Sequence, residues 1–228
     1  MESPFCPVDA IKNDADFRLI ETFGSVPGQG VARRELHLAR LTRSAQYFGI
    51  PLDASAFEAQ LAAVSRHPAP LRCRLTLSPD GQLHMETAQM PPQARTWVFA
   101  IAEERLSSAD IFLAHKTTRR DIYTAARSTL ASGLDELVFL NERDELCEGT
   151  ICNIALTTPQ GETLTPPLAS GCLPGVYRQS CLNQGSLTEA VLTLNDLAEA
   201  RSITLMNALR GATDAIWAPD CGEFTSFA

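Results

Sequence analysis

Residues 111–120 read IFLAHKTTRR and contain Lys116, one of only two lysines in the chain. The chain has 19 basic side chains, of which 17 are arginine, and the other lysine, Lys12, lies in a polar N-terminal stretch. Lys116 instead follows an apolar-leaning run. A lysine beside an apolar segment loses its proton more easily than an exposed one, because burial disfavours the ammonium form. A Schiff-base lysine needs that property, and a surface lysine in a basic turn is the alternative interpretation.

On the C-terminal side of Lys116 the hydrophobic pattern predicts a series of helices and strands. A helix is expected over 119–130, a strand over 136–140, a turn over 141–145 and a second strand over 146–157 that is interrupted near 148–150. Pro174-Gly175 is expected to open a helix that runs to Leu182. Asn195 is expected to cap a helix that ends at Ala200, and residues 203–206 read as a buried strand.

On its N-terminal side the pattern predicts a unit of strands and helices. Helices are expected over 35–48 and 54–65, and strands over 18–24, 71–77, a partner through Leu83 and Met85, and 97–102. Pro79-Asp80-Gly81 is typical of a hairpin turn, so the sheet is expected to be antiparallel. The polar run 103–109 is the candidate junction between a small α+β domain, 1–104, and a larger domain, 105–228.

The composition excludes several function classes. The net charge is -8 and no basic face is evident, which argues against nucleic acid or an anionic membrane surface as a partner. No apolar run is long enough to span a bilayer, and the start lacks the regions of a signal peptide. The seven cysteines form no C-x-x-C pair and no histidine cluster accompanies them, so no metal site is expected and the thiols are expected to be free in a reducing cytoplasm.

Each polar motif is weak evidence of function by itself. The order of the motifs along the chain is the specific signal. In chain order they are His37-Leu38-Ala39-Arg40-Leu41, Lys116, Glu148-Gly149-Thr150-Ile151-Cys152-Asn153, Thr165-Pro166-Pro167-Leu168, Leu173-Pro174-Gly175-Val176-Tyr177-Arg178 and Met206-Asn207-Ala208-Leu209-Arg210. Over about Leu19 to Gly211 this series resembles the class IV, or fold-type IV, pyridoxal-phosphate (PLP) family. That family contains branched-chain and D-amino-acid aminotransferases and aminodeoxychorismate lyase.

The resemblance implies an α+β, two-domain fold like that of D-amino-acid aminotransferase, with PLP in the interdomain cleft and a homodimer as the assembly. Lys116 would carry PLP as a Schiff base and act as the general base. Glu148 would face the pyridine nitrogen and keep the ring protonated, so that the ring can act as an electron sink.

The resemblance also implies a set of residues that bind the PLP phosphate. A helix that begins near Gly175 presents free N–H groups to an anion, and an arginine adds a charge-assisted contact. An ordinary helix cap and a solvated arginine are the alternatives. The phosphate-binding residues implied are Arg40, Val176, Tyr177, Asn207 and Ala208.

The remaining candidates border the cofactor or the substrate. Thr22 resembles a family threonine that borders PLP, where as a catalytic residue it could relay a proton or position the substrate, with a plain strand residue as the alternative. Tyr123 could reach the cofactor from the helix after Lys116 and is a candidate for binding the substrate. His115 is expected only to neighbour the lysine. Cationic side chains should bind the substrate's carboxylates; the candidates are Arg119, Arg120 and Arg210.

Within the family, HKTTRR, CLPGVYR and NALRG most resemble the lyase members. The resemblance therefore implies a small-molecule substrate, 4-amino-4-deoxychorismate, converted to p-aminobenzoate and pyruvate. An aminotransferase acting on branched-chain or D-amino acids is the alternative. A non-enzymatic interaction protein on the same fold is the third reading, and the presence of Lys116, Glu148 and Arg40 together argues against it.

Overall fold

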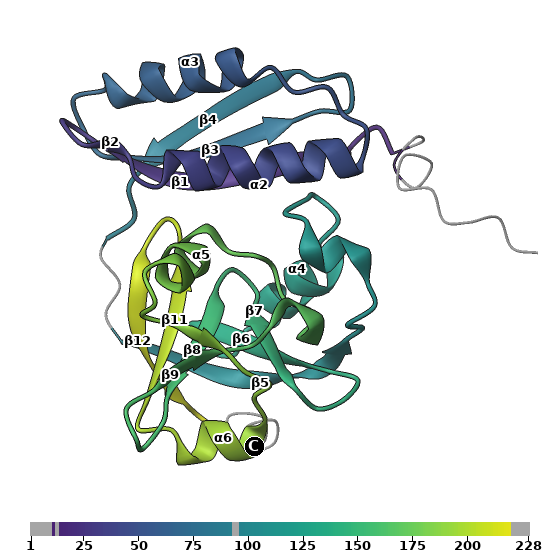
Figure 1. Cartoon of the computed structure of the whole chain (residues 1–228), viewed down its shortest axis with the longest axis vertical. Helices are drawn as coiled ribbons and strands as arrows, with labels where there is room; N and C mark the ends of the chain where they lie inside the picture. The colour runs from purple at the N-terminus through teal and green to yellow at the C-terminus, as the bar shows by residue number, and fades with distance from the viewer. Residues whose placement is uncertain (1–10, 12–13, 93–95, 220–228) are drawn as a thin grey trace, which may run out of the picture. The chain divides into compact units, whose positions relative to one another are not determined.

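The structure, a computed structural model, describes residues 11, 14–92 and 96–219, and these form two compact units (Figure 1). Unit 1 holds the described residues up to 92 together with 115–119, and unit 2 holds those of 96–114 and 120–219. Lys12 lies outside the described residues. The units divide before β5 (Trp97–Leu106) rather than near residue 104, because that strand continues through the polar run. Its residues 103–105 are exposed strand, so polarity there marks a solvated face and not a junction.

Unit 1 is a four-stranded antiparallel sheet with the order β2-β1-β3-β4 and two helices. Its strands are β1 (Leu19–Val26), β2 (Gly30–Val31), β3 (Leu71–Leu77) and β4 (Leu83–Gln89). Cys73, Leu75 and Leu77 are fully buried, as the alternation in the sequence predicts. Phe23 of β1 lies opposite Cys73, so the same face of both strands enters the core.

The helices of unit 1 are α2 (Arg34–Tyr47) and α3 (Ala54–Ser65). Asp53 caps α3, because its carboxylate accepts the N–H groups of Ser55 and Ala56. The apolar face of α3 is buried through Phe57, Leu61 and Val64. Both helices pack on β1.

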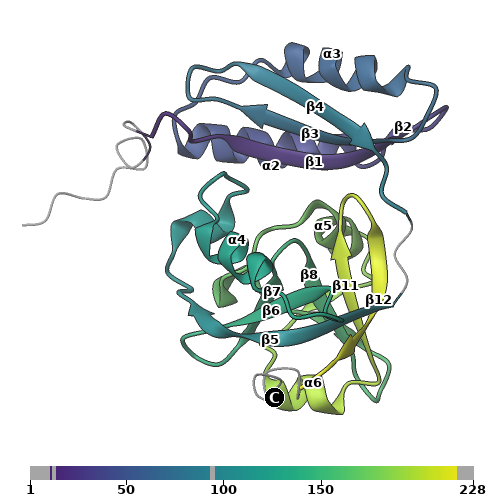
Figure 2. The same ribbon diagram turned by 180° about the vertical axis from the view of Figure 1, so that it is seen from behind.

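Unit 2 is built on a mixed sheet that closes on itself (Figure 2). The order β8-β11-β12-β5-β6-β7 returns to β8 through a pairing of β7 with β8, and β9 and β10 extend the sheet beyond β8. The strands other than β5 are β6 (Glu136–Asn141), β7 (Leu146–Gly149), β8 (Asn153–Thr157), β9 (Thr163–Thr165), β10 (Thr188–Glu189), β11 (Ser202–Asn207) and β12 (Gly211–Trp217). Glu148 and Asn153 are the pair at which β7 meets β8, so the predicted interruption near 148–150 is the turn that closes the sheet.

The helical segments of unit 2 are short. They are η1 (Ile111–Ala114), α4 (Asp121–Ser128), η2 (Leu168–Ser170), α5 (Val176–Asn183) and α6 (Leu194–Glu199). Sequence reasoning was wrong in placing the cap of α6 at Asn195. Thr193 caps it in a capping box with Asp196, since each side chain bonds the other's backbone N–H. None of the described helices is long and apolar enough to cross a lipid bilayer.

The core of unit 2 has three parts. The largest, inside the closed sheet, includes Phe99, Val138, Leu140 and Ile154. A second packs Phe139 with Tyr123 of α4. A third packs α5 against Met206 of β11 and Ala155 of β8, so α5 begins next to the strands that carry the predicted site residues.

Candidate active site

Lys116 lies in a short segment that is attached to β1 like an extra strand. Its carbonyl accepts the N–H of Ile20 at 2.8 Å, and the N–H of Thr118 donates to the carbonyl of Arg18 at 3.0 Å. The Thr118 hydroxyl accepts the N–H of Arg18 at 2.9 Å. These bonds explain why residues 115–119 belong to unit 1 although the chain on either side belongs to unit 2. The backbone that carries the lysine amine is therefore fixed on both sides.

His115 is more than a neighbour of the lysine. Its side chain is buried, its Nδ1 lies 2.9 Å from the Ser44 hydroxyl of α2, and its ring packs on Tyr47 and Phe48. Burial, reinforced by the charge of Arg43, lowers the pKa of His115 to about 4. The ring is therefore neutral at pH 7 and anchors the lysine segment to α2 by packing and one hydrogen bond.

Arg40 takes part in a buried charged cluster on the helix side of the sheet. Its Nε and Nη2 donate to the two carboxylate oxygens of Glu21 at 2.8 and 2.6 Å, and His37 Nδ1 lies 2.6 Å from the same carboxylate. Burial alone would raise the pKa of Glu21, but Arg40 and His37 lower it to about 2. The predicted phosphate arginine is thus held by two carboxylate contacts, which sequence reasoning did not anticipate.

Thr22 and Arg119 also belong to unit 1. Thr22 is half-buried, and as the residue after Glu21 it points to the face of the sheet opposite the one on which Glu21 receives Arg40. Arg119 donates from Nε to the Asp14 carboxylate at 2.9 Å, and its guanidinium lies over the Phe17 ring. Its side chain is 35% exposed, so the charge remains accessible from solvent.

Glu148 is a buried carboxylate in unit 2 with both oxygens engaged. Oε1 accepts the Tyr123 hydroxyl at 2.7 Å. Oε2 accepts the backbone N–H of Leu173 at 3.0 Å and the side-chain amide of Asn153 at 3.3 Å. The carboxylate is thereby fixed in one orientation by three elements, α4, β8 and the segment before α5.

The N-terminus of α5 lies beside this carboxylate. Gly175 is the N-cap, and a Cβ added there would overlap the side-chain oxygen of Asn153. Glycine is therefore required where Asn153 packs under the helix start. Asn153 also donates to the carbonyl of Leu173 at 2.9 Å, so one side chain ties the chain before the helix to Glu148.

Asn207 shapes the loop that joins β11 to β12. Its side-chain oxygen accepts the N–H groups of Leu209 and Arg210, and its amide donates to the carbonyl of Ile151 at 3.3 Å. Ala208 is inside this turn. A Cβ on Gly211 would lie 3.4 Å from the Tyr177 ring, which brings the loop and α5 together.

The structure therefore assembles the predicted residues in two groups. Unit 1 carries Thr22, Arg40, Lys116 and Arg119, and unit 2 carries Arg120, Tyr123, Glu148, Val176, Tyr177, Asn207, Ala208 and Arg210. Asn153 was quoted in a motif without a role, yet it links Glu148 to α5. The roles of Glu21 and His37 in the Arg40 cluster were missed as well. The sequence did offer a sign of them, since both are polar residues on faces whose other residues are apolar.

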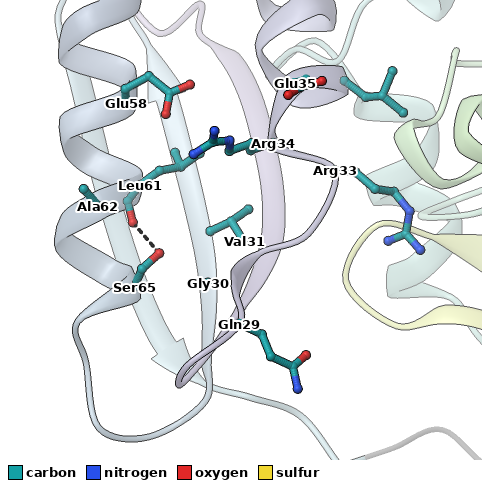
Figure 3. Close-up of a pocket in the computed structure, with 11 residues that line it drawn as sticks. Gln29, Gly30, Val31, Arg33, Arg34, Glu35, Glu58, Leu61, Ala62 and Ser65 are labelled. Carbon is teal, nitrogen blue, oxygen red and sulfur yellow. Dashed lines mark hydrogen bonds between the residues drawn. The ribbon is translucent and has the colours of Figure 1, made fainter.

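A cavity of about 530 Å³ lies elsewhere in unit 1, between the start of α2 and α3 (Figure 3). Its lining includes Arg33, Arg34, Glu58 and Ser65, and none of the predicted site residues. Arg33 has a left-handed conformation, φ 56°, as the N-cap of α2. The charges of both signs around this cavity select no particular ligand.

Known proteins match nearly the whole chain. The family model for amino-transferase class IV matches residues 18–215. An alignment 133 positions long, which covers 50% of this chain and only 35% of the other protein, shows 30% identity to aminodeoxychorismate lyase from Saccharomyces cerevisiae.

Two solved structures add to this. A Mesorhizobium loti protein, provisionally assigned as an amino-acid aminotransferase, is 38% identical with a TM-score of 0.84, and the match covers 89% of this chain and 100% of that one. The 4-amino-4-deoxychorismate lyase of Pseudomonas aeruginosa has a TM-score of 0.76 over 88% of this chain and 82% of that one, and at 20% identity it shows the fold alone. Because the family model covers far more than half of the sequence, the chain belongs to the class IV aminotransferases, a family of PLP-dependent enzymes that includes aminotransferases and lyases.

Proposed function

We propose that this chain binds PLP and converts 4-amino-4-deoxychorismate to p-aminobenzoate and pyruvate. The observation that carries the cofactor assignment is the fixed carboxylate of Glu148 beside the glycine-started α5. This combination fits PLP. The pyridine nitrogen of PLP needs an anionic partner, and the phosphate of PLP needs a helix N-terminus that no side chain blocks. Similarity to the yeast lyase supports the choice of reaction.

The proposed roles follow from the two groups of residues. Bound PLP supplies an electron sink for the pair left behind when a proton leaves the substrate. Lys116, on its fixed backbone, would hold the cofactor covalently until the substrate amine takes its place, and the freed lysine amine would then take the proton from the amine-bearing ring carbon. Loss of that proton would make the substrate ring aromatic as its C–O bond to the enolpyruvyl group breaks. The enolpyruvyl group would leave with the bonding electrons as the enolate of pyruvate, which becomes pyruvate by taking up the proton that Lys116 removed.

Phosphate recognition is proposed for backbone N–H groups of Val176, Tyr177 and Ala208. At an anion site the first turn of a helix offers such donors. Asn207 acts by shaping the loop around Ala208, because its side-chain oxygen already accepts two backbone N–H groups. Arg40 adds positive charge from unit 1. A cofactor position between the two units and a homodimeric assembly remain predictions.

The test is to load the protein with PLP, generate aminodeoxychorismate in place from chorismate, glutamine and a synthase, and follow both products. Equal release of p-aminobenzoate and pyruvate, lost in Lys116→Ala and kept in Lys12→Ala, is the expected result. No release from a protein that retains the visible absorption of bound PLP would overturn the lyase assignment.

That second outcome would favour an aminotransferase. The observation that supports an aminotransferase is the 38% identity to the Mesorhizobium loti protein, whose whole length is matched. Screening of branched-chain and D-amino acids as amino donors, with 2-oxoglutarate as acceptor, would then identify the substrate. The same Lys116→Ala variant would abolish that activity too.

A further inference from the structure

Glu136, the first residue of β6, is a fully buried carboxylate to which the roles above assign nothing. Burying a carboxylate is costly unless it is paired and hydrogen-bonded. Glu136 offsets that cost by accepting hydrogen bonds, most of them from one short segment, the turn between β7 and β8. That turn, residues 150–152, follows Gly149, the neighbour of Glu148 in the chain, and directly precedes Asn153.

The two carboxylate oxygens hold different parts of the turn. Oε1 accepts the hydroxyl of Thr150, and also its backbone N–H at 3.1 Å. Oε2 accepts the N–H of Ile151 and the thiol of Cys152, each at 3.2 Å. Arg127 supplies the countercharge at 3.3 Å from Oε1 and also donates to the Thr150 hydroxyl at 2.9 Å.

The carbonyl groups of the same turn are held from elsewhere in unit 2. Arg120 donates to the carbonyl of Thr150 at 2.8 Å, and Asn207 donates to that of Ile151 at 3.3 Å. The turn also packs closely on Glu136, because a Cβ on Gly149 would lie 3.0 Å from Glu136 Cγ. Both the donors and the acceptors of the turn's backbone are therefore fixed, and Glu136 takes most of the donors.

We infer that Glu136 is a positioning residue, which sets the turn and through it the orientation of Glu148 toward the cofactor ring. The inference rests on the proposed PLP site and extends it to a residue that does not touch the cofactor. It also gives Arg120 a structural role, in the turn rather than at the substrate. In Glu136→Gln one of the two carboxylate oxygens becomes an NH2 group, which would face the backbone N–H of either Thr150 or Ile151, so the turn must shift.

The experiment compares Glu136→Gln with Glu145→Gln in the full chain. Glu145 is the matched control, because it lies at the other end of the same β6–β7 hairpin, pairs with Arg143 at 2.8 Å and accepts from Asn141 and Ser170. The measurements are the dissociation constant of PLP and the position of its visible absorption band. Glu148→Gln sets the direction in which the band moves when the carboxylate is lost.

Glu136→Gln is expected to weaken PLP binding by about fivefold or more and to move the band in the same direction as Glu148→Gln. Glu145→Gln is expected to leave the band unchanged. A folded Glu136→Gln protein with the wild-type band and affinity would overturn the inference. Failure of the wild-type protein to take up PLP would instead overturn the proposed function, so the two failures are distinguishable.

A milder pair of variants decides the matter if Glu136→Gln does not fold. Thr150→Val keeps the shape of the side chain and removes the hydroxyl that donates to Glu136, and Thr150→Ser keeps that hydroxyl. The expected result is a displaced band for Thr150→Val and a wild-type band for Thr150→Ser. Equal bands in the two variants would contradict the positioning role.

Discussion

Tyr123 of α4 donates its hydroxyl to Glu148 of β7 over 2.7 Å, inside unit 2. Burial raises the pKa of Tyr123 strongly, and the neighbouring charge of Glu148 raises it further. The phenol therefore stays protonated at neutral pH and remains a donor. Sequence reasoning placed Tyr123 at the cofactor or the substrate, and this hydrogen bond gives it a further role as a support for the carboxylate.

Tyr123→Phe should weaken the cofactor site while keeping the core intact. The ring would still pack edge-on against Phe139, and only the donor to Glu148 is lost. We expect PLP to bind several-fold more weakly and the free energy of unfolding to fall by about 1 kcal/mol. Fluorescence titration with PLP and urea unfolding measure both quantities. Tyr47→Phe, at a partly exposed position on α2, is the control. Equal PLP affinity in Tyr123→Phe and wild type would rule out the supporting role.

Gly175→Ala should damage the start of α5 for a steric reason. The added Cβ would overlap the side-chain oxygen of Asn153, so either the asparagine or the helix must move. We expect a loss of stability of about 1–3 kcal/mol together with weaker PLP binding. Gly161→Ala is the comparison, because a Cβ there meets nothing within 4 Å and only its left-handed backbone is strained. If both variants bind PLP alike, Gly175 has no special role at the site.

His115 should make stability depend on pH in a defined window. Its folded-state pKa of about 4 lies below the ordinary 6.5, so between those values the unfolded chain binds a proton that the folded chain does not. This contribution to stability is present above pH 6.5 and is lost as the pH falls toward 4. Urea unfolding at pH 7.0, 5.5 and 4.5 should show a shallower decline in His115→Gln than in the wild type. The exposed His84→Gln should follow the wild type, and an identical slope in all three would count against the burial of His115.

Glu21 acts in a lower pH window. Its folded pKa of about 2 lies below the ordinary 4.5, so the stability that it provides is present above pH 4.5 and lost as the pH falls toward 2. Glu21→Gln removes the carboxylate that accepts two hydrogen bonds from the buried Arg40 guanidinium, at an expected cost of about 3–5 kcal/mol. Calorimetry at pH 7 measures the loss, with the exposed Glu86→Gln on β4 as control. A loss no larger than that of the control would mean that the cluster adds nothing to stability.

The strength of the local signal explains which elements could be predicted. The bounds of β3 and α3 agree with the sequence pattern, because each has one strongly apolar face. β12 was missed, since only Thr213 of its residues is buried and its pairing with β11 and β5 gives no pattern in its own sequence. The order of the polar motifs along the chain identified the motifs of the candidate site, but it did not identify the partner that each side chain contacts. Those partners, such as Tyr123 for Glu148, come from elements that meet only in the folded unit.

Alanine variants of Arg119 and Arg210 should show, through their KM values, whether these arginines bind the substrate carboxylates or have structural roles. Arg119 already pairs with Asp14 and is 35% exposed, and the Arg210 guanidinium lies 5.4 Å from the centre of the Trp97 ring. If either cation binds a substrate carboxylate, its change to alanine removes a charged hydrogen bond and should raise KM about tenfold, with a smaller effect on kcat. Asp14→Ala separates the two roles of Arg119, because it removes the carboxylate that accepts from the guanidinium and should leave KM unchanged or lower it. Unchanged KM in both arginine variants would place the carboxylate-binding cations elsewhere in the chain.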